Sequence, residues 1–303
     1  MRLNNYPSIS VIIPCKGHAE ELRACLIGLH HMDVQVPYET IVVDSNSDPA
    51  VRCTVQHFPN IKVIQSKENL NAGPARNLGV TQAAGDFFAF IDADCIPTNH
   101  WLQAAHDELA RGAQMVGGPV LDALPFHPIA TADNLLQFAD LGPKRPLGKA
   151  EILPACNLAV RKEVFETING FPNAPYIEDS LFTNAIAVHW PDNCLFIPKM
   201  QVKHRGRTTL KELWYHQNYF GFMRGIFGFR VRQYQQILAC RWYFVPLIIL
   251  KRLGYIFKRT HMWNPGLLIR NFLFLPLIVF GQLAWAVGFR QGCRRRLIIL
   301  RRN

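Results

Sequence analysis

Short apolar segments alternate with amphipathic segments over the first 111 residues, and this alternation limits the possible fold more than any other feature. Four segments are rich in β-branched or aromatic residues and are expected to be strands: Ser8–Pro14, Glu39–Asp44, Ile61–Gln65 and Asp86–Asp92. Three others have helical spacing: Ala19–His31, Asn71–Ala84 and Asn99–Arg111. The pattern predicts an α/β fold, with a mostly parallel twisted sheet covered by helices on both faces.

Two aspartates, Asp44 and Asp92, come at the carboxyl ends of predicted strands. Ligands of open α/β sheets bind at those ends, so both side chains are expected to point into one crevice. Asp94 follows two residues after Asp92, and the two carboxylates share a face if the chain stays extended there. Carboxylate oxygens are suitable ligands for Mg²⁺ or Mn²⁺, so this edge of the sheet is a candidate metal site.

The positive charge of the chain is concentrated at its end. Residues 1–202 contain 14 lysines and arginines against 21 acidic residues, whereas residues 203–303 contain 19 cations and a single acid, Glu212. A basic region of this kind calls for an anionic partner, either lipid headgroups or nucleic acid. We expect a catalytic domain over residues 1–206, with halves of about 1–118 and 119–206, and a basic helical region over 207–303.

The basic region is also apolar. A helical stretch is expected from Thr208 to about Ala239, followed by the apolar segments Trp242–Leu250 and Asn271–Phe289, the second with nineteen uncharged residues. Lysine and arginine interleaved with aromatic and aliphatic residues favour an anionic membrane surface over nucleic acid. Helices lying in the membrane plane or re-entrant helices keep every cation near one headgroup layer, and a membrane hairpin is the second arrangement considered.

No secretory signal is visible at the start of the chain, and its eight cysteines are scattered without a C-x-x-C pair. They are expected to be reduced and mostly buried thiols. These features predict a location at the cytoplasmic face of the cell membrane.

Several short motifs occur in order along the chain, at the predicted strand ends and helix starts. They are Ser10–Pro14, Ile41–Asp44, Ala72–Asn77, Phe90–Asp94, Cys156–Arg161, Gly170–Phe171, Glu178–Asp179 and His204. In this order they resemble the family 2 glycosyltransferases, and in particular their membrane-associated bacterial members. The resemblance covers about residues 8–205 and implies the GT-A fold.

The resemblance also implies roles for residues at the first strand ends. Pro14 would shape the loop over the nucleoside through backbone contacts, and Asp44 would bind the base or the ribose. Arg76 would lie near the diphosphate or the sugar. Asp92 would contact ribose or metal, and Asp94 would ligate the metal.

A second set of roles concerns the later motifs. Asp179 resembles the general base of the inverting members, with Glu178 beside it and Asn157 also on the acceptor side. His204 resembles the late histidine that completes the metal site of some members; an imidazole ligand suits Mn²⁺ better than Mg²⁺. A phosphate-facing or lipid-facing histidine is the alternative for His204, and a helix N-terminal acidic pair is the alternative for Glu178 and Asp179.

The sequence departs from the family at two points. Cys15-Lys16-Gly17 stands where a hydroxyl residue, an aromatic residue and an asparagine are usual, so no hydroxyl contact is expected at Cys15. The Gln-x-x-Arg-Trp motif of processive synthases fails in spacing, because four residues separate Gln236 from Arg241-Trp242. The expected function is therefore inverting transfer of one sugar from a nucleotide-diphosphate sugar to a hydroxyl of a lipid-linked or membrane-associated glycan acceptor, as in the synthesis of cell-envelope polysaccharides.

Two other functions remain as alternatives. A nucleotidyltransferase that forms the sugar nucleotide also uses strand-end carboxylates, but it typically has a glycine-rich basic phosphate loop that Pro14–Gly17 does not supply. A non-catalytic membrane scaffold with a degenerate domain would not need Asp92, Asp94 and Asp179.

Overall fold

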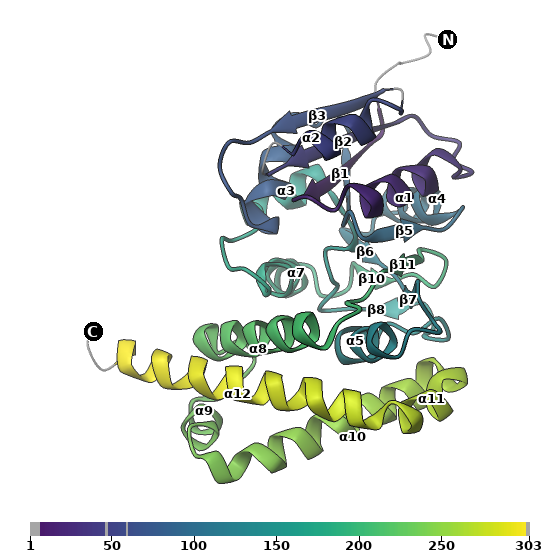
Figure 1. Cartoon of the computed structure of the whole chain (residues 1–303). Coiled ribbons are helices and arrows are strands. Elements are labelled where there is room, and N and C mark those ends of the chain that lie inside the picture. Colours follow the sequence, from purple (N-terminus) through teal and green to yellow (C-terminus); the bar gives the residue numbers. More distant parts are fainter. Residues whose placement is uncertain (1–6, 46–47, 59, 301–303) are drawn as a thin grey trace, which may run out of the picture. The chain divides into compact units, whose positions relative to one another are not determined.

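The computed structural model describes residues 7–45, 48–58 and 60–300, except for the side chain of Gln233. The chain forms two compact units (Figure 1). Unit 1 contains residues 1–121 and 146–204, and unit 2 contains residues 122–145 and 205–303. The sequence-based boundary near residue 206 differs from this division at one segment, because residues 122–145 belong to the helical unit.

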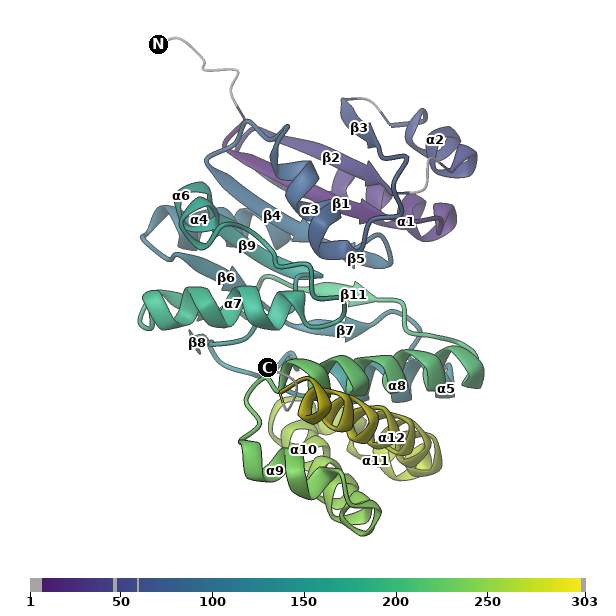
Figure 2. The ribbon, with the colours of Figure 1, turned by 90° about the vertical axis from the view of Figure 1, so that its left-hand side faces the viewer.

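Unit 1 is built on an eight-stranded sheet with the order β3-β2-β1-β4-β9-β6-β10-β8 (Figure 2). A second sheet has the order β5-β11-β7. The strands are β1 (Ile9–Cys15), β2 (Tyr38–Asp44), β3 (Ile61–Gln65), β4 (Phe87–Ile91), β5 (Cys95–Pro97), β6 (Met115–Gly117), β7 (Val120–Asp122), β8 (Gly148–Lys149), β9 (Asn157–Arg161), β10 (Cys194–Phe196) and β11 (Val202–His204). Helices α1 (Ala19–His30), α2 (Pro49–Val55), α3 (Ala72–Val80), α4 (Trp101–Ala110), α6 (Lys162–Ile168) and α7 (Glu178–His189) accompany them.

The first four strands of the large sheet, β3, β2, β1 and β4, are mutually parallel. On one face Ile41 and Val43 pack with Ala75 of α3. Because strand side chains alternate, Val42 points to the opposite face, and it is equally buried. Helices therefore cover both faces, and the α/β fold class expected from the alternating pattern is confirmed.

Past residue 111 the expected strands are shorter than the sequence indicates. A strand over Ile152–Val160 is expected, but β9 begins only at Asn157 and pairs antiparallel with both β4 and β6. Asn157 is preceded by a turn, closed by its own backbone N–H to the Pro154 carbonyl at 3.1 Å. Pro154 carries no N–H for a sheet ladder, which explains why the strand does not start earlier.

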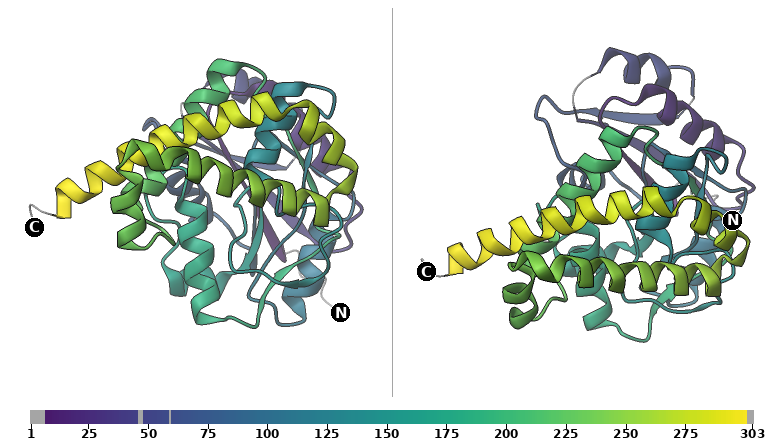
Figure 3. Two further views of the ribbon diagram at one scale, coloured as in Figure 1. Left: turned by 90° about the horizontal axis from the view of Figure 1, so that it is seen from below. Right: turned by 60° about the horizontal axis from the view of Figure 1, so that its bottom comes forward.

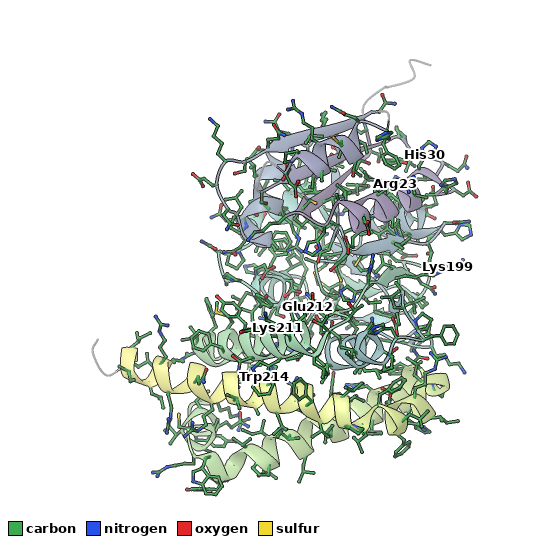
Figure 4. The ribbon with its side chains drawn as sticks, in the orientation of Figure 1. Arg23, His30, Lys199, Lys211, Glu212 and Trp214 are labelled. Carbon is green, nitrogen blue, oxygen red and sulfur yellow. The ribbon has the colours of Figure 1, made fainter. Side chains whose placement is uncertain are left out.

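Unit 2 is helical (Figure 3). Its helices are α5 (Pro128–Phe138), α8 (Leu210–Phe227), α9 (Gln233–Ala239), α10 (Val245–Trp263), α11 (Leu268–Leu273) and α12 (Leu275–Leu300), with 3₁₀ turns η1 (Trp242–Phe244) and η2 (Pro265–Leu267). A capping box of Thr209 and Glu212 starts α8, and Glu212 is labelled in Figure 4. Apolar residues of α5, α8, α10 and α12 form a common core.

Glycines bring α8 and α12 into backbone contact. A Cβ at Gly225 would lie 2.5 Å from the Phe289 carbonyl oxygen, and one at Gly221 would overlap the Trp285 carbonyl. From the other side, a Cβ at Gly288 or Gly292 would overlap a backbone carbonyl of α8. Each helix thus carries a G-x-x-x-G pair on its contact face, an arrangement that permits very close helix packing.

Two expected helical stretches are broken. The stretch from Thr208 ends at Gly228, which has the left-handed conformation common after a helix, and resumes as α9. The apolar segment Asn271–Phe289 is interrupted at Phe274, after which Pro276 lies in the first turn of α12. No single helix among the described residues is long and apolar enough to cross a membrane. The pair Pro265–Leu273 and Leu275–Leu300, bent by 82°, meets that test together by length and composition.

Candidate functional site

The carboxyl ends of three parallel strands define the edge of the sheet on which the site lies. Cys15 at the end of β1 is in register with Asp44 at the end of β2, and Asp92 follows directly after β4. Asp44 is fully buried. Asp92 and Asp94 each keep about a third of their side-chain surface exposed, at 33% and 32%. The strand-end carboxylates at this edge therefore include a buried one, Asp44, and two accessible ones, Asp92 and Asp94.

Asp92 and Asp94 do not lie on an extended strand, as the two-residue spacing suggested. The chain turns here, and the Cys95 backbone N–H donates to the Asp92 carbonyl at 3.0 Å. The turn gives the two carboxylates separate partners, Arg76 for Asp92 and His204 for Asp94. The condition of an extended chain, on which the sharing of a face depended, is therefore not met.

Arg76 of α3 connects the two halves of the site. Its Nη2 donates to Asp92 Oδ1 at 2.5 Å and its Nη1 donates to Glu178 Oε1 at 3.1 Å. The guanidinium is buried and lies over the ring of Phe171, 5.3 Å from its centroid. Burial by itself lowers the pKa of Arg76, but the charges of Asp92 and Glu178 outweigh it and the net shift is upward. Arg76 is therefore a permanent cation between a strand-end carboxylate and the start of α7.

Local sequence explains how α3 comes so close to α7. A Cβ at Gly73 would lie 3.0 Å from the Pro172 carbonyl oxygen and 3.2 Å from Glu178 Cγ. Asn77, one residue after Arg76, donates to the Phe171 carbonyl at 2.8 Å and accepts from the Phe171 N–H at 2.9 Å. The lack of a side chain at Gly73 lets the start of α7 approach α3, and the two hydrogen bonds between Asn77 and Phe171 fix the segment that leads into α7.

Glu178 and Asp179 open α7 as adjacent carboxylates. Burial, together with the charge of Asp179, raises the pKa of Glu178 to about 7, against the opposing effect of Arg76. Burial also raises the pKa of Asp179, opposed by Arg76 and by the Ser180 N–H, which donates to Asp179 Oδ1 at 2.5 Å. Among the described residues, Glu178 Oε2 has no hydrogen-bond partner. The pair combines one carboxyl with a near-neutral pKa and a second, partly exposed carboxylate.

Asp94 and His204 form a second contact. The strands β5 and β11 pair Cys95 with His204, which places the imidazole Nε2 3.7 Å from Asp94 Oδ2. No group of three or more His, Cys, Asp or Glu side chains suited to a metal occurs in the described part of the chain. These two residues fit a divalent cation that has two protein ligands and takes its other ligands from a bound molecule or water.

Asn157 does not take the acceptor-side position expected for it. Its side chain is fully buried, and Oδ1 accepts from Trp101 Nε1 at 2.8 Å. Its Nδ2 donates to the carbonyls of Pro119 and Met200, each at 2.9 Å. Both polar atoms are thus engaged inside unit 1, where the Asn157 side chain connects Trp101 with the backbone of Pro119 and Met200.

Pro14 and Cys15 are the last two residues of β1, where Pro14 is in register with Val43 of β2, and the loop toward α1 begins at Lys16. Burial raises the pKa of the Cys15 thiol to about 12, assisted by Asp44 and other nearby acids, and Cys15 Sγ donates to the Gly17 carbonyl at 2.9 Å. Cys15 is therefore a neutral thiol engaged with its own loop. Gly17 has a φ of 70°, a conformation that few other residues adopt easily.

The pairing of Arg76 with Glu178 could not be inferred from sequence spacing, because 102 residues separate them. The sequence also suggested no separate role for Asn77. Asn77 ends the motif Ala72–Asn77 and Phe171 ends the motif Gly170–Phe171, and the structure joins the two motifs through this residue pair.

The sequence of this chain is similar to those of known glycosyltransferases. A family model described as Glycosyl transferase family 2 matches residues 10–168, more than half of the chain. The glycosyltransferase AglE of Haloferax volcanii is 31% identical over 173 residues, covering 55% of this chain and 57% of AglE. The pre-mycofactocin glycosyltransferase of Mycobacterium tuberculosis is 23% identical over 225 residues, covering 72% of this chain and 47% of that protein. The chain thus spans about half the length of these curated relatives.

Solved structures extend the likeness to nearly the whole chain. The mannosyltransferase PcManGT of Pyrobaculum calidifontis, in complex with GDP-Man and Mn²⁺, matches 94% of this chain and 87% of its own, with a TM-score of 0.61 and 18% identity. TarS residues 1–349 of S. aureus match with a TM-score of 0.53 and 17% identity, covering 94% of this chain and 92% of that chain. At these identities the likeness establishes the fold, which is that of GT-A enzymes.

Proposed function

The chain belongs to glycosyl transferase family 2, and we propose that it moves one sugar from a nucleotide-diphosphate sugar to a hydroxyl of a lipid-linked or membrane-associated glycan acceptor, with inversion at the anomeric carbon. The observation that carries this proposal is the Arg76 bridge. A single buried cation pairs with the strand-end carboxylate Asp92 and with Glu178, the first residue of α7 and the neighbour of Asp179. Donor-binding and proton-accepting groups are needed together for this reaction.

Donor binding is assigned to the strand ends. In this assignment the backbone around Pro14 and the carboxylate of Asp44 hold the nucleoside, and Asp92 meets the ribose. Arg76 fixes Asp92 through a charge-assisted hydrogen bond, so its expected role beside the diphosphate or sugar is joined by a positioning role.

A divalent metal is assigned to Asp94 and His204. The 3.7 Å between Asp94 Oδ2 and His204 Nε2 allows both atoms to bind one ion, and the imidazole nitrogen favours Mn²⁺ over Mg²⁺. When bound, such an ion neutralises the negative charge that develops on the leaving diphosphate. The crystallised PcManGT complex with Mn²⁺ supports this assignment by analogy of fold.

The general base is assigned to Asp179. The acceptor hydroxyl attacks the anomeric carbon of the donor sugar, its proton passes to an Asp179 oxygen, and the bond between the anomeric carbon and the diphosphate oxygen breaks. The raised pKa of Asp179 makes the carboxylate a stronger proton acceptor than an ordinary aspartate. Glu178 accepts a hydrogen bond from Arg76 and so fixes the start of α7, where Asp179 lies.

Unit 2 supports a location on the cytoplasmic face of the cell membrane. Its residues include 20 lysines and arginines against four acids. Large apolar side chains are exposed on η1, α10 and α11, among them Trp242, Leu250, Ile269 and Leu273 at 64–74%. Exposed aromatic and aliphatic residues combined with cations suit a layer of anionic headgroups.

The donor assignment is tested by thermal stabilisation. The full chain is screened against sugar nucleotides with and without Mn²⁺, in the wild type and in Asp94→Asn. We expect at least one donor to raise the wild-type Tm in an Mn²⁺-dependent manner, and Asp94→Asn to lose that dependence. If Asp94→Asn keeps the full Mn²⁺-dependent shift, the assignment of Asp94 as a ligand is wrong.

A further inference from the structure

Unit 2 contains a partly buried arginine whose surroundings are rich in hydrogen-bond donors. Arg252 of α10 donates through Nε to Gln282 Oε1 of α12 at 2.5 Å. Its guanidinium carbon Cζ lies over the Trp285 ring, 3.7 Å from the centroid. Among the described residues no carboxylate pairs with Arg252. Burial and the nearby charge of Arg224 on α8 lower the pKa of Arg252 to about 9, as expected for a cation that lacks a nearby anion.

The two partners of Arg252 are themselves incompletely bonded. Gln282 is fully buried and Trp285 is 5% exposed, yet Gln282 Nε2 and Trp285 Nε1 have no hydrogen-bond partner in the described part of the chain. Leaving a buried donor unpaired costs about 1–3 kcal/mol, and a cation more. Two orphan N–H groups therefore lie on the residues that contact an unneutralised guanidinium.

An anion with several acceptor oxygens would satisfy these groups together. Acceptor oxygens would take the Nη hydrogens of Arg252 and the free N–H groups, and the negative charge would offset Arg252 and Arg224. We propose that Arg252, Gln282 and Trp285 form a binding site for a phosphate group. This site goes beyond sugar transfer and does not depend on it, because none of the residues assigned to donor or base takes part.

The neighbouring surface indicates where the phosphate comes from. Tyr255, three residues after Arg252 and so on a neighbouring face of α10, is 48% exposed, and Leu247 and Leu250 expose 59% and 64% on the other side of the same helix. A phosphate attached to an acyl or isoprenoid chain matches a cationic site on a helix that carries such exposed apolar side chains. A soluble phosphate offers the same oxygens to Arg252 but gains nothing from that surface.

Three variants test the site. Arg252→Gln removes the cation, and Lys251→Gln is the matched control, because it removes the same charge from an exposed neighbour on the same helix. Gln282→Glu places a carboxylate against Arg252, so we expect it to raise the Tm while it blocks the site from within. A variant that is more stable but does not bind phosphate cannot be explained by failure to fold.

Two probes are titrated against the full chain: inorganic phosphate, followed by Tm at constant ionic strength, and phosphatidylcholine vesicles with or without phosphatidic acid, followed by co-sedimentation. We expect Arg252→Gln and Gln282→Glu to bind phosphatidic acid vesicles about ten- to a hundredfold more weakly than the wild type, and Lys251→Gln to bind nearly as well. A lipid source is shown if vesicles bind and inorganic phosphate gives little stabilisation; a soluble source is shown by the reverse.

If the wild type, Arg252→Gln and Gln282→Glu bind both probes equally well, the proposed phosphate site is wrong. Arg252 would then only connect α10 to α12 through its bond to Gln282. A wild type that responds to neither probe would overturn the site as well. Neither result affects the Mn²⁺-dependent donor shift, so failure of this site and failure of the proposed sugar transfer are distinguishable.

Discussion

One arginine in each unit of this chain is buried or partly buried, and the two are surrounded in opposite ways. In unit 1 the buried cation Arg76 is neutralised by Asp92 and Glu178, and the buried amide of Asn157 uses both polar atoms. In unit 2 the partners of Arg252 among the described residues are one amide oxygen and an aromatic ring, and no acid. Internal pairing fixes the geometry that catalysis needs, whereas unpaired positive charge and free donors provide for a partner from outside the chain.

The units also differ in what brings their elements together. Unit 1 relies on strand pairing and on side-chain contacts between residues far apart in the sequence, such as Arg76 and Glu178, which are 102 residues apart. The α8–α12 contact of unit 2 relies on the absence of side chains, at Gly221 and Gly225 on α8 and at Gly288 and Gly292 on α12. Substitutions that remove the charge of the Arg76 bridge and substitutions that add volume at the α8–α12 contact therefore test these two arrangements separately.

The largest effect is expected from Asp179→Asn. Loss of a positioned general base lowers turnover by about 10²–10⁴-fold, while donor binding, measured as an Mn²⁺-dependent Tm shift, should persist. Asp192→Asn is the control, because Asp192 is an exposed acid that pairs with Lys149. Steady-state release of nucleoside diphosphate measures both. Turnover within a few-fold of wild type in Asp179→Asn would remove the assigned base.

The next effect concerns the pH dependence of stability in unit 1. Glu178 has a pKa of about 7 in the folded protein and an ordinary value of 4.5. Between these values the folded state holds the proton more tightly than the unfolded chain, so the stabilisation is complete below about pH 4.5 and is lost as pH rises through about 7.

Denaturant unfolding of wild type and Glu178→Gln across this range measures the difference. The wild type should lose roughly 3 kcal/mol of unfolding free energy relative to Glu178→Gln. A difference that is flat with pH, or that grows in the opposite direction, would show that Arg76 keeps Glu178 ionised throughout.

The smallest effect in the series tests the helix contact of unit 2. Gly288→Ala places a methyl group against the Asn218 carbonyl, a backbone atom that cannot move cheaply, and should destabilise the protein by at least about 2 kcal/mol. Gly254→Ala is the matched substitution, because a Cβ there meets open space. Replacing a helical glycine by alanine at such a position stabilises by up to about 1 kcal/mol. Opposite signs of the two Tm changes are expected; equal signs would contradict the contact.

Much of unit 1 could be predicted from the sequence because its signals are local. Runs of β-branched residues located the first strands, and their ends located Asp44 and Asp92. The turn after β4 and the partners it gives to Asp92 and Asp94 could not be predicted, since no spacing rule distinguishes a turn from an extended pair. Asn157 was misplaced for a similar reason: a motif position does not tell whether a side chain faces substrate or the interior.

Unit 2 was less predictable. The nineteen-residue apolar segment suggested one long helix, and only tertiary packing places the break at Phe274. The spacing of Gly221 with Gly225 and of Gly288 with Gly292 was a signal in the sequence for close helix packing. Arg252 carried no such signal, because its significance lies in what contacts it.

The stereochemistry of the product tests the central claim most directly. The donor that gives the largest Mn²⁺-dependent Tm shift is incubated with the full chain and a membrane lipid extract, and the new anomeric bond is identified by ¹H NMR and the product by mass. We predict a product with one added sugar and inverted configuration, absent with Asp179→Asn. Retained configuration, or undiminished transfer by Asp179→Asn, would contradict direct displacement assisted by Asp179.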